Sequence, residues 1–156
     1  MKLTNARLTT CFISVLISIS FSQQTIAEPI EYFSSQRNID NHYPFSNAVR
    51  VGDLLFLSGE IGTQPDSSEL IEGGIKNETK QTMENIKASL AKHNLTMNDL
   101  VKCTVMLADI KDWPAFNQVY KNYFPKHFPA RSAFATNGLA LNARVEVECI
   151  GVFSSQ

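Results

Sequence analysis

The last apolar segment of the chain alternates between two kinds of side chain. Within residues 144–153, two valines and Cys149 alternate with Glu146 and Glu148. Successive side chains of a β-strand point to opposite faces of the sheet. The segment is therefore predicted to be a strand with one apolar face, covered by other elements, and one face that carries two carboxylates.

Four further strands are predicted from runs of apolar and β-branched residues. They span residues 48–51, 54–58, 101–108 and 132–136. The pair Gly52-Asp53 between the first two is typical of a two-residue hairpin turn. The strand 54–58 is apolar on both faces, which indicates burial on both sides. Residues 28–42 are polar and predict only a leader strand or arm.

Two helices are predicted from apolar residues that recur at helical spacing. The first begins near Asn77 or Thr79 and ends near His93. The second begins at Asp112, which we expect to cap it, and continues to Phe124. Between them, Thr96 and the acid three residues later indicate a short capped turn.

The order of these elements is strand, strand, helix, strand, helix, strand, strand. It predicts an α+β domain of two layers, with a mostly antiparallel sheet and both helices on one face. The chain of 156 residues is long enough for one such domain. The second face of the sheet would remain open in a single subunit. If that face also carries Leu55 or Leu57, self-association is expected.

The first 27 residues have the layout of a secretory signal. Lys2 and Arg7 precede an apolar run over Leu8–Phe21, and small residues follow up to Ala27. A membrane anchor is the alternative, but the run is shorter than the roughly 20 residues that span a bilayer. We predict cleavage after Ala27 and a single mature domain over residues 28–156. The predicted location is periplasmic or secreted, with no membrane association after cleavage.

The charge balance limits the possible partners, and the cysteine content limits the possible crosslinks. The chain has 14 basic and 15 acidic residues, and removal of Lys2 and Arg7 with the signal leaves 12 and 15, a net charge of −3. This balance gives no electrostatic case for a nucleic-acid partner. Cys103 and Cys149 remain in the mature chain. Both a disulfide and two buried free thiols are compatible with their apolar surroundings.

Few residue patterns point to chemistry. The histidines lie far apart without metal-ligand spacing, so no metal site is predicted. Ser58-Gly59 lacks the preceding glycine of a nucleophile elbow. Arg131 is predicted at the mouth of a loop, where a proline fixes the incoming backbone, and is a natural receptor for a small carboxylate. Glu146 is a candidate for proton transfer or water activation. The alternatives are a structural ion pair for the arginine and a solvated strand face for the glutamate.

With these residues placed, the chain resembles the RidA/YjgF/UK114 family of reactive-intermediate deaminases. The matching stretches are Tyr43–Ala48, Leu54–Ile61, Thr79–Ile86, Asp112–Phe124, Pro129–Ser132 and Val145–Glu148. Together they cover nearly all of residues 43–153. The resemblance implies a chorismate-mutase-like α+β subunit that forms a homotrimer. The three sheets would form an inner barrel, with clefts between neighbouring subunits.

The resemblance also implies a reaction. Arg131 would bind the carboxylate of a small 2-imino acid, and Glu146 would orient or activate the water that attacks the imine carbon. The products would be a 2-keto acid and ammonia, formed without a metal or an organic cofactor. Phe45 would pack against the substrate's side chain. The other cleft positions implied are Ser58, Gly59, Glu60, Asn117 and Ala133.

The sequence departs from the family pattern at three of these positions. Phe45 replaces a tyrosine, Glu60 stands where glutamine is frequent, and Ala133 stands where cysteine is common. A trimeric binding protein for small carboxylates, without turnover, is the alternative function. A third, the endoribonuclease or translation-inhibitor activity attached to some members, gains no support from this sequence.

Overall fold

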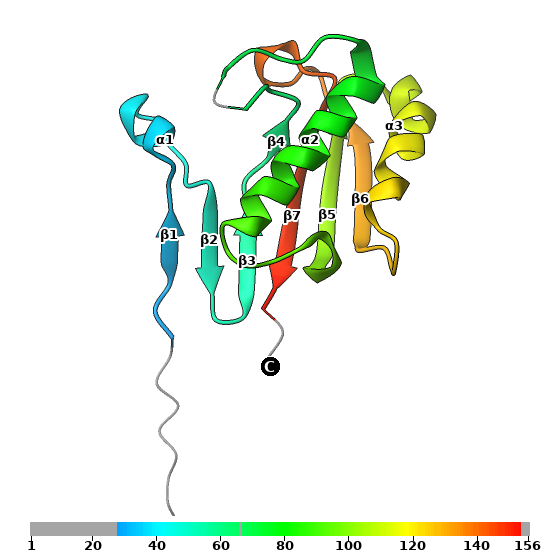
Figure 1. Cartoon of the computed structure of the whole chain (residues 1–156). Coiled ribbons are helices and arrows are strands. Elements are labelled where there is room, and N and C mark those ends of the chain that lie inside the picture. Colours follow the sequence, from blue (N-terminus) through cyan, green and yellow to red (C-terminus); the bar gives the residue numbers. More distant parts are fainter. Residues whose placement is uncertain (1–27, 66, 154–156) are drawn as a thin grey trace, which may run out of the picture.

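A computed structural model describes residues 28–65 and 67–153 (Figure 1). The predicted signal segment, residues 1–27, lies outside the described residues. The strands are β1 (Glu31–Phe33), β2 (Ala48–Val51), β3 (Leu54–Leu57), β4 (Glu60–Ile61), β5 (Leu100–Leu107), β6 (Ala130–Ala135) and β7 (Val145–Val152). The helices are α1 (Gln36–Asp40), α2 (Gly74–Ala91) and α3 (Trp113–Tyr120).

All the strands belong to one sheet, in the order β1-β2-β3-β7-β5-β6, and β4 pairs with β7 beyond the end of β3. Only the pair β5–β6 is parallel among the described strands. The hairpin between β2 and β3 turns at Gly52, which has a φ of 55°. A positive φ costs little at glycine. The prediction of a mostly antiparallel α+β domain is confirmed.

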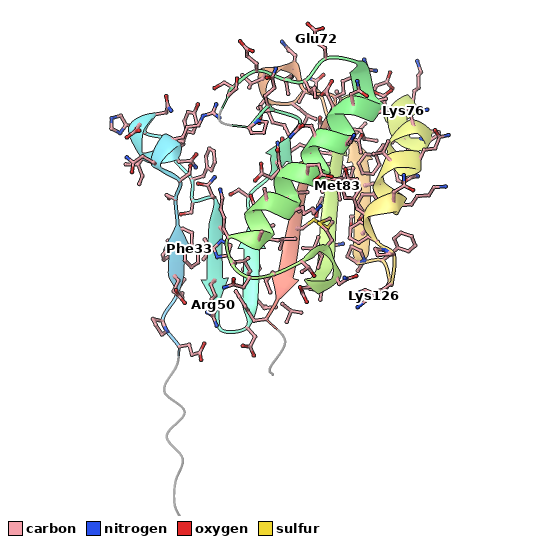
Figure 2. The ribbon with its side chains drawn as sticks, in the orientation of Figure 1. Phe33, Arg50, Glu72, Lys76, Met83 and Lys126 are labelled. Carbon is pink, nitrogen blue, oxygen red and sulfur yellow. A yellow bond between two sulfur atoms is a disulfide. The ribbon has the colours of Figure 1, made fainter. Side chains whose placement is uncertain are left out.

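The two long helices lie on the same face of the sheet (Figure 1). The apolar stripe predicted for α2 is buried, since Thr79, Met83, Ile86 and Leu90 are all 0% exposed. Figure 2 shows Met83 between α2 and the sheet. On the sheet side, Val145 and Val147 of β7 are also 0% exposed. The apolar face of this strand is therefore covered, and its carboxylates lie on the open face, as the alternation predicted.

The helix boundaries differ from the prediction. Helix α2 begins at Gly74, earlier than Asn77, because Gly73 adopts a left-handed conformation with a φ of 105°. The side chain of Asn77 then donates to the carbonyl of Glu72 at 3.0 Å. The capped turn at Thr96 is confirmed, since its backbone N–H donates to the Asp99 carboxylate at 2.7 Å.

Asp112 is the N-cap residue of α3, as predicted, but its side chain makes no capping hydrogen bond. Its carboxylate accepts two hydrogen bonds from the guanidinium of Arg144, at 2.8 and 3.0 Å. The carboxylate of Asp109 instead caps the 3-10 turn that leads into α3, accepting from the N–H of Lys111 at 2.9 Å. A strong cationic partner thus withdrew the nearer acid from the helix end.

Burial of β3 on both faces is also wrong. Leu55 and Leu57 are 0% and 6% exposed and lie under the helices, whereas Leu54 and Phe56 are each 39% exposed on the open face. The self-association expected from Leu55 or Leu57 therefore needs another basis. Leu54, Phe56 and Phe134 supply it, because the exposed apolar side chains of the open face include these three.

Strands β5 and β7 are joined by a disulfide between Cys103 and Cys149. The two residues are direct register partners, with Cα atoms 4.1 Å apart, and both are buried. Of the two states left open by the sequence, the structure shows the disulfide. It lies in the core between the sheet and the helices.

Candidate active site

A large cavity lies beside α2, at the end of the sheet where β3 passes into β4. Its volume is about 920 Å³. The segment before β2 contributes Tyr43, Phe45 and Asn47 to the wall, and α1 contributes Arg37 and Asn38. Four predicted site residues also line it: Ser58, Gly59, Glu60 and Glu146. Together with Phe45, five of the eight predicted site residues therefore face one cavity.

The position of Glu146 depends on an irregularity in the sheet. Phe56 of β3 pairs with Ile150, and Glu60 of β4 pairs with Val147, so three residues on one side face two on the other. This one extra residue is a β-bulge, a feature that often re-aims side chains next to active sites. The bulge contains Ser58 and Gly59.

Gly59 provides the space that the Glu146 carboxylate occupies. A Cβ atom added at Gly59 would lie 2.0 Å from Oε1 of Glu146. No residue with a side chain can stand here without moving the carboxylate. Ser58 fixes the bulge, because its hydroxyl donates to the carbonyl of Ser46 at 2.6 Å and its N–H donates to the carbonyl of Asn47 at 3.0 Å.

Two carboxylates in this cavity have raised pKa values. Burial raises the pKa of Glu146, and the negative charge of Glu148 on the same face of β7 raises it further. Burial also raises the pKa of Glu60, against the opposing effects of a hydrogen bond from Ser89 and the charge of Lys92. The Ser89 hydroxyl donates to Oε1 of Glu60 at 2.8 Å. A carboxylate with a pKa moved toward neutrality is suited to proton transfer.

Phe45 is half exposed at the cavity wall and stacks on Tyr43. The ring centroids are 5.7 Å apart and the planes differ by 10°. Phe45 replaces a tyrosine of the family pattern, but Tyr43 also lines the cavity. The cavity therefore has a phenol group, contributed two residues earlier in the chain.

Arg131 lies apart from this cavity. It is the second residue of β6, within a strand and not at the mouth of a loop as the sequence indicated. It pairs in register with Cys103, and its guanidinium faces α3. Glu146 points to the opposite face, because its neighbour Val147 is buried under the helices. The two predicted catalytic residues therefore lie on different faces of one subunit.

Three aromatic rings of α3 surround the guanidinium. Its Cζ atom lies 4.7 Å from the ring centroid of Tyr120, 5.7 Å from that of Phe116 and 5.9 Å from that of Trp113. Each distance is within the range of a cation–π contact. We call these three rings and Arg131 the aromatic cage. Arg131 has no carboxylate partner within the part of the chain that the structure describes.

Tyr120 is the most enclosed polar member of the cage. It is 4% exposed, and its hydroxyl finds no hydrogen-bond partner among the described residues. Burial raises its pKa to about 12, although the charge of Arg131 acts in the opposite direction. The phenol is therefore neutral over the working range of enzymes, and its ring face contacts the guanidinium.

The remaining predicted site residues belong with the cage. Ala133 follows Arg131 by two residues on β6 and shares its face, and Asn117 lies on α3 next to Phe116. The eight predicted residues thus fall into two groups. Five line the cavity around Glu146, and three belong to the aromatic cage or adjoin it.

Within residues 28–65 and 67–153, no cluster of three metal-ligating side chains is found. In the same ranges, no helix has the length and apolar character needed to cross a membrane.

Comparison with known proteins assigns the fold to a family. The family described as Endoribonuclease L-PSP matches residues 35–153. The chain belongs to this family, also known as RidA/YjgF.

Named relatives of the RidA/YjgF family include deaminases. The human 2-iminobutanoate/2-iminopropanoate deaminase is 38% identical over 109 residues, covering 70% of this chain and 80% of the human protein. The goat protein of the same name is 43% identical over 109 residues, with the same coverage of both chains.

A solved structure also matches. The structure of E. coli TdcF with bound serine has a TM-score of 0.69, with 27% identity, and covers 84% of this chain and 100% of the other. The RidA/YjgF fold predicted from the sequence is therefore confirmed.

Sequence reasoning missed the cage and part of the cavity. Phe116 and Tyr120 belong to an apolar stripe at helical spacing, which gives no sign that a cation lies against it, and Trp113 lies outside that stripe. Tyr43 gave a usable signal, since it stands two residues from the position where the family has a tyrosine. Ser89 and Lys92 gave none, because a polar helix face is ordinarily solvated.

Proposed function

We propose that the chain is a deaminase of 2-imino acids, which it hydrolyses to 2-keto acids and ammonia. The observation that carries the proposal is the pair of complementary groups in the two halves of the site. Arg131 is a guanidinium without a carboxylate partner among the described residues, and Glu146 is a partly buried carboxylate with a raised pKa. The names of the relatives support this reaction.

In the proposed mechanism, the substrate carboxylate accepts two hydrogen bonds from Arg131. The imine carbon is electrophilic when the imine nitrogen is protonated, so the enzyme mainly has to position water. Glu146 accepts a proton while the water oxygen bonds to the imine carbon, which gives a tetrahedral amino alcohol. The carbon–nitrogen bond then breaks. Glu146 returns its proton to the nitrogen, which leaves as ammonia. Glu146 then accepts the proton of the hydroxyl group, whose oxygen becomes the carbonyl oxygen of the 2-keto acid, and passes this proton to ammonia or solvent.

The mechanism requires a second copy of the chain. Arg131 and Glu146 lie on opposite faces of one subunit, so one subunit cannot present both to one substrate. We propose a homotrimer, in which the cage of one subunit closes the cavity of the next. The open sheet face supports this, because it exposes Leu54, Phe56 and Phe134 to solvent in a single chain.

The ligand of a solved relative fits the same arrangement. TdcF of E. coli binds serine, an amino acid with a free carboxylate. A 2-imino acid carries the same carboxylate on the carbon that is attacked. We therefore expect the aromatic cage to be the carboxylate end of the ligand and the cavity to receive the rest.

We also propose that the mature chain works in the periplasm or outside the cell. The pattern of residues 1–27 supports export, and the disulfide between Cys103 and Cys149 is of a kind that persists in oxidising compartments. The test is the N-terminal residue of the protein recovered from a cell that exports it. Glu28 as the first residue would support cleavage after Ala27, and retention of Met1 would contradict it.

The first experiment measures turnover. An amino-acid oxidase generates 2-iminobutanoate, semicarbazide traps the imine that remains, and acceleration of its loss by the protein is recorded. Loss of two charge-assisted hydrogen bonds, each worth about 1.5–3 kcal/mol, lowers kcat/KM by about 10²- to 10⁴-fold in Arg131→Ala. Arg50→Ala is the matched control, because Arg50 lies 4.2 Å from the ring of Phe153 but outside the site. No acceleration by the intact protein would refute the deaminase.

A second experiment tests the sharing of the site between subunits. Equal amounts of Arg131→Ala and Glu146→Gln are co-assembled, although each alone is inactive. If a site takes its arginine from one subunit and its glutamate from the next, about one site in four contains both in a random mixture. Recovery of about a quarter of the normal activity supports the shared site. No recovery would show that both residues act from the same chain.

Binding without turnover is the alternative outcome, and Phe45 is the observation that favours it. This position lacks the hydroxyl of the family's tyrosine, which could bind substrate or water. Calorimetric binding of a 2-keto acid that depends on Arg131, with no turnover, would assign the binding function. The family description also mentions an endoribonuclease. RNA cleavage that survives in both Arg131→Ala and Glu146→Ala would come from another site or a contaminant.

A further inference from the structure

The cavity is larger than the smallest 2-imino acids need. Its volume of about 920 Å³ lies near the top of the roughly 300–1,000 Å³ range of pockets that enclose drug-sized ligands. The inference rests on the deaminase function proposed above. In that function, the aromatic cage binds the carboxylate of the substrate. The cage of the next subunit takes up part of this volume in the proposed homotrimer, and a side chain of only one or two carbons would occupy only the part of the cavity nearest Glu146.

The wall farther from Glu146 is polar. Helix α2 contributes Gln81, Glu84, Asn85 and Ser89, and Lys92 follows at its C-cap, so that polar residues form one stripe along the cavity. Glu84 already accepts a hydrogen bond from the hydroxyl of Tyr123 at 3.0 Å and lies 3.6 Å from Lys87. A ligand pocket is mostly apolar, and a small number of placed polar groups give it specificity. The polar groups of this wall suit a side chain that makes hydrogen bonds.

Most polar groups of the wall already have partners. Asn85 donates to the carbonyls of Ile61 and Thr63 at 2.9 and 3.0 Å, and accepts from Gln81 at 2.9 Å. Arg37 donates to the carbonyl of Ser67 at 2.6 Å and also bonds to Ser68. These groups hold the loop after β4 in place, so they are not available to a ligand without loss of structure.

Glu60 and Lys92 are the charged groups of the wall that retain capacity. The Glu60 carboxylate accepts one hydrogen bond, from Ser89, which leaves its second oxygen available within the described structure. Lys92 is exposed and forms no ion pair in the described part of the chain. A carboxylate in a partly desolvated pocket favours a donor or a cation and disfavours a second anion.

We propose that the substrates are 2-imino acids with a long side chain ending in an N–H donor group, such as a carboxamide or guanidinium, which Glu60 binds. A carboxamide satisfies both charged groups at once, because its NH₂ donates to Glu60 while its carbonyl oxygen accepts from Lys92. A terminal carboxylate would meet Glu60 with like charge. A thioether or alkyl group would leave the second oxygen of Glu60 without a partner, which costs binding free energy.

The test compares three substrates of similar length. An amino-acid oxidase generates the 2-imino acids of glutamine, methionine and glutamate, and kcat/KM is measured for each. We expect the glutamine-derived imine to exceed the methionine-derived one by about tenfold, the effect of one hydrogen bond to a charged group. The glutamate-derived imine should be the poorest of the three.

The Glu60→Gln variant tests whether Glu60 causes the preference for the glutamine-derived imine. A glutamine keeps the size of the side chain and removes its charge. The ratio of kcat/KM for the glutamine-derived over the methionine-derived imine should fall about tenfold, and the glutamate-derived imine should improve. Glu72→Gln is the matched control, because Glu72 is exposed and does not line the cavity (Figure 2). Its ratio should stay as in the unchanged protein.

The outcomes separate this inference from the proposed function. If the methionine-derived imine is preferred and Glu60→Gln changes no ratio, the enzyme is a deaminase and the inference is wrong. If no imine is hydrolysed, the deaminase is refuted, and calorimetric binding of L-glutamine, L-methionine and L-glutamate decides the inference. Tighter binding of glutamine that depends on Glu60 supports it, and equal affinities overturn it.

Discussion

The two halves of the candidate site are built by different means. The Glu146 half depends on backbone geometry, because a bulge and the bare Cα of Gly59 make room for the carboxylate. The Arg131 half depends on side chains, because aromatic rings of one helix surround the guanidinium. One half is a cavity that holds two carboxylates, and the other is a cation resting on an apolar surface.

This difference separates the two tasks of the site. The backbone at Gly59 leaves room for the Glu146 carboxylate beside the cavity, where proton transfer needs it. An aromatic cage orients a cation without neutralising it, so the guanidinium remains available to an anionic ligand. An ion pair within the subunit would have satisfied Arg131 and removed this capacity.

The disulfide connects the two halves, and its removal has the largest expected effect on stability. Cys103 pairs in register with Arg131, and Cys149 lies three residues from Glu146 on β7. A crosslink between residues separated by 46 positions lowers the entropy of the unfolded chain. This stabilises the folded state by roughly 4 kcal/mol. We expect the double variant Cys103→Ala, Cys149→Ala to lose a comparable free energy of unfolding, measured in urea.

The control is the unchanged protein unfolded with and without dithiothreitol. Reduction should bring its urea midpoint close to that of the double variant. If the midpoint does not depend on the reductant, the two strands are not held by this bond in solution.

Gly59→Ala tests the backbone seat. No positive φ is recorded at this glycine, so alanine can adopt its backbone conformation, but its Cβ would lie 2.0 Å from the Glu146 carboxylate. Displacement of a catalytic group by about 1 Å can lower the rate by about a hundredfold. We expect a loss of this size in kcat/KM. In a Glu146→Ala background the same substitution should cost no further thermal stability, and an equal cost there would show that the clash lies elsewhere.

Tyr120 tests the cage. Tyr120→Leu removes one ring face from the guanidinium, a contact worth about 0.5–2 kcal/mol. We expect KM for the imino acid to rise about three- to thirtyfold with a smaller change in kcat. Tyr120→Phe keeps the ring and should keep KM. It also removes a buried hydroxyl that has no partner in the described structure, so the melting temperature should not fall. Equal KM values for both variants would argue against a cation–π role.

The smallest expected effect is a pH shift in the Glu146 half. If Glu146 acts as the base, kcat/KM falls as pH decreases through its pKa, which burial and Glu148 raise above 4.5. Glu148→Gln removes the neighbouring charge and should move this acid limb to lower pH. An unmoved limb would mean that another group controls it.

The same shift has a consequence for stability. A carboxyl with a raised pKa in the folded state contributes most at low pH. That contribution is lost as pH rises through the folded pKa.

The sequence predicted what depends on local periodicity. The alternation around Glu146 and the stripe of Met83 and Ile86 are each patterns within one strand or helix that buries one face in the core. The main strands and helices, the layers and the separation of the two carboxylates from the core followed from those patterns.

The features that sequence reasoning missed depend on contacts between distant segments. The carboxylate of Asp112 makes no capping hydrogen bond, because it accepts a hydrogen bond from Arg144, which is distant in the sequence. The residue types of Leu54 and Phe56 do not distinguish an open sheet face from a covered one, because every residue of β3 is apolar. The cage around Arg131 needed the packing of α3 on β6, which no spacing within either element encodes.

The extra residue in the bulge makes chain length a determinant of the chemistry. Deletion of one residue between Phe56 and Glu60 would let the paired strands run in regular register, and Glu60 could still face Val147. The strand pairing on either side and Leu57 in the core could be kept, yet the space that Gly59 leaves beside Glu146 would be lost. Within this family, a relative shorter by one residue here can thus keep the architecture while losing the seat of its carboxylate. Insertions and deletions at this point, more than substitutions in the core, offer evolution a direct route between an enzyme and a binding protein.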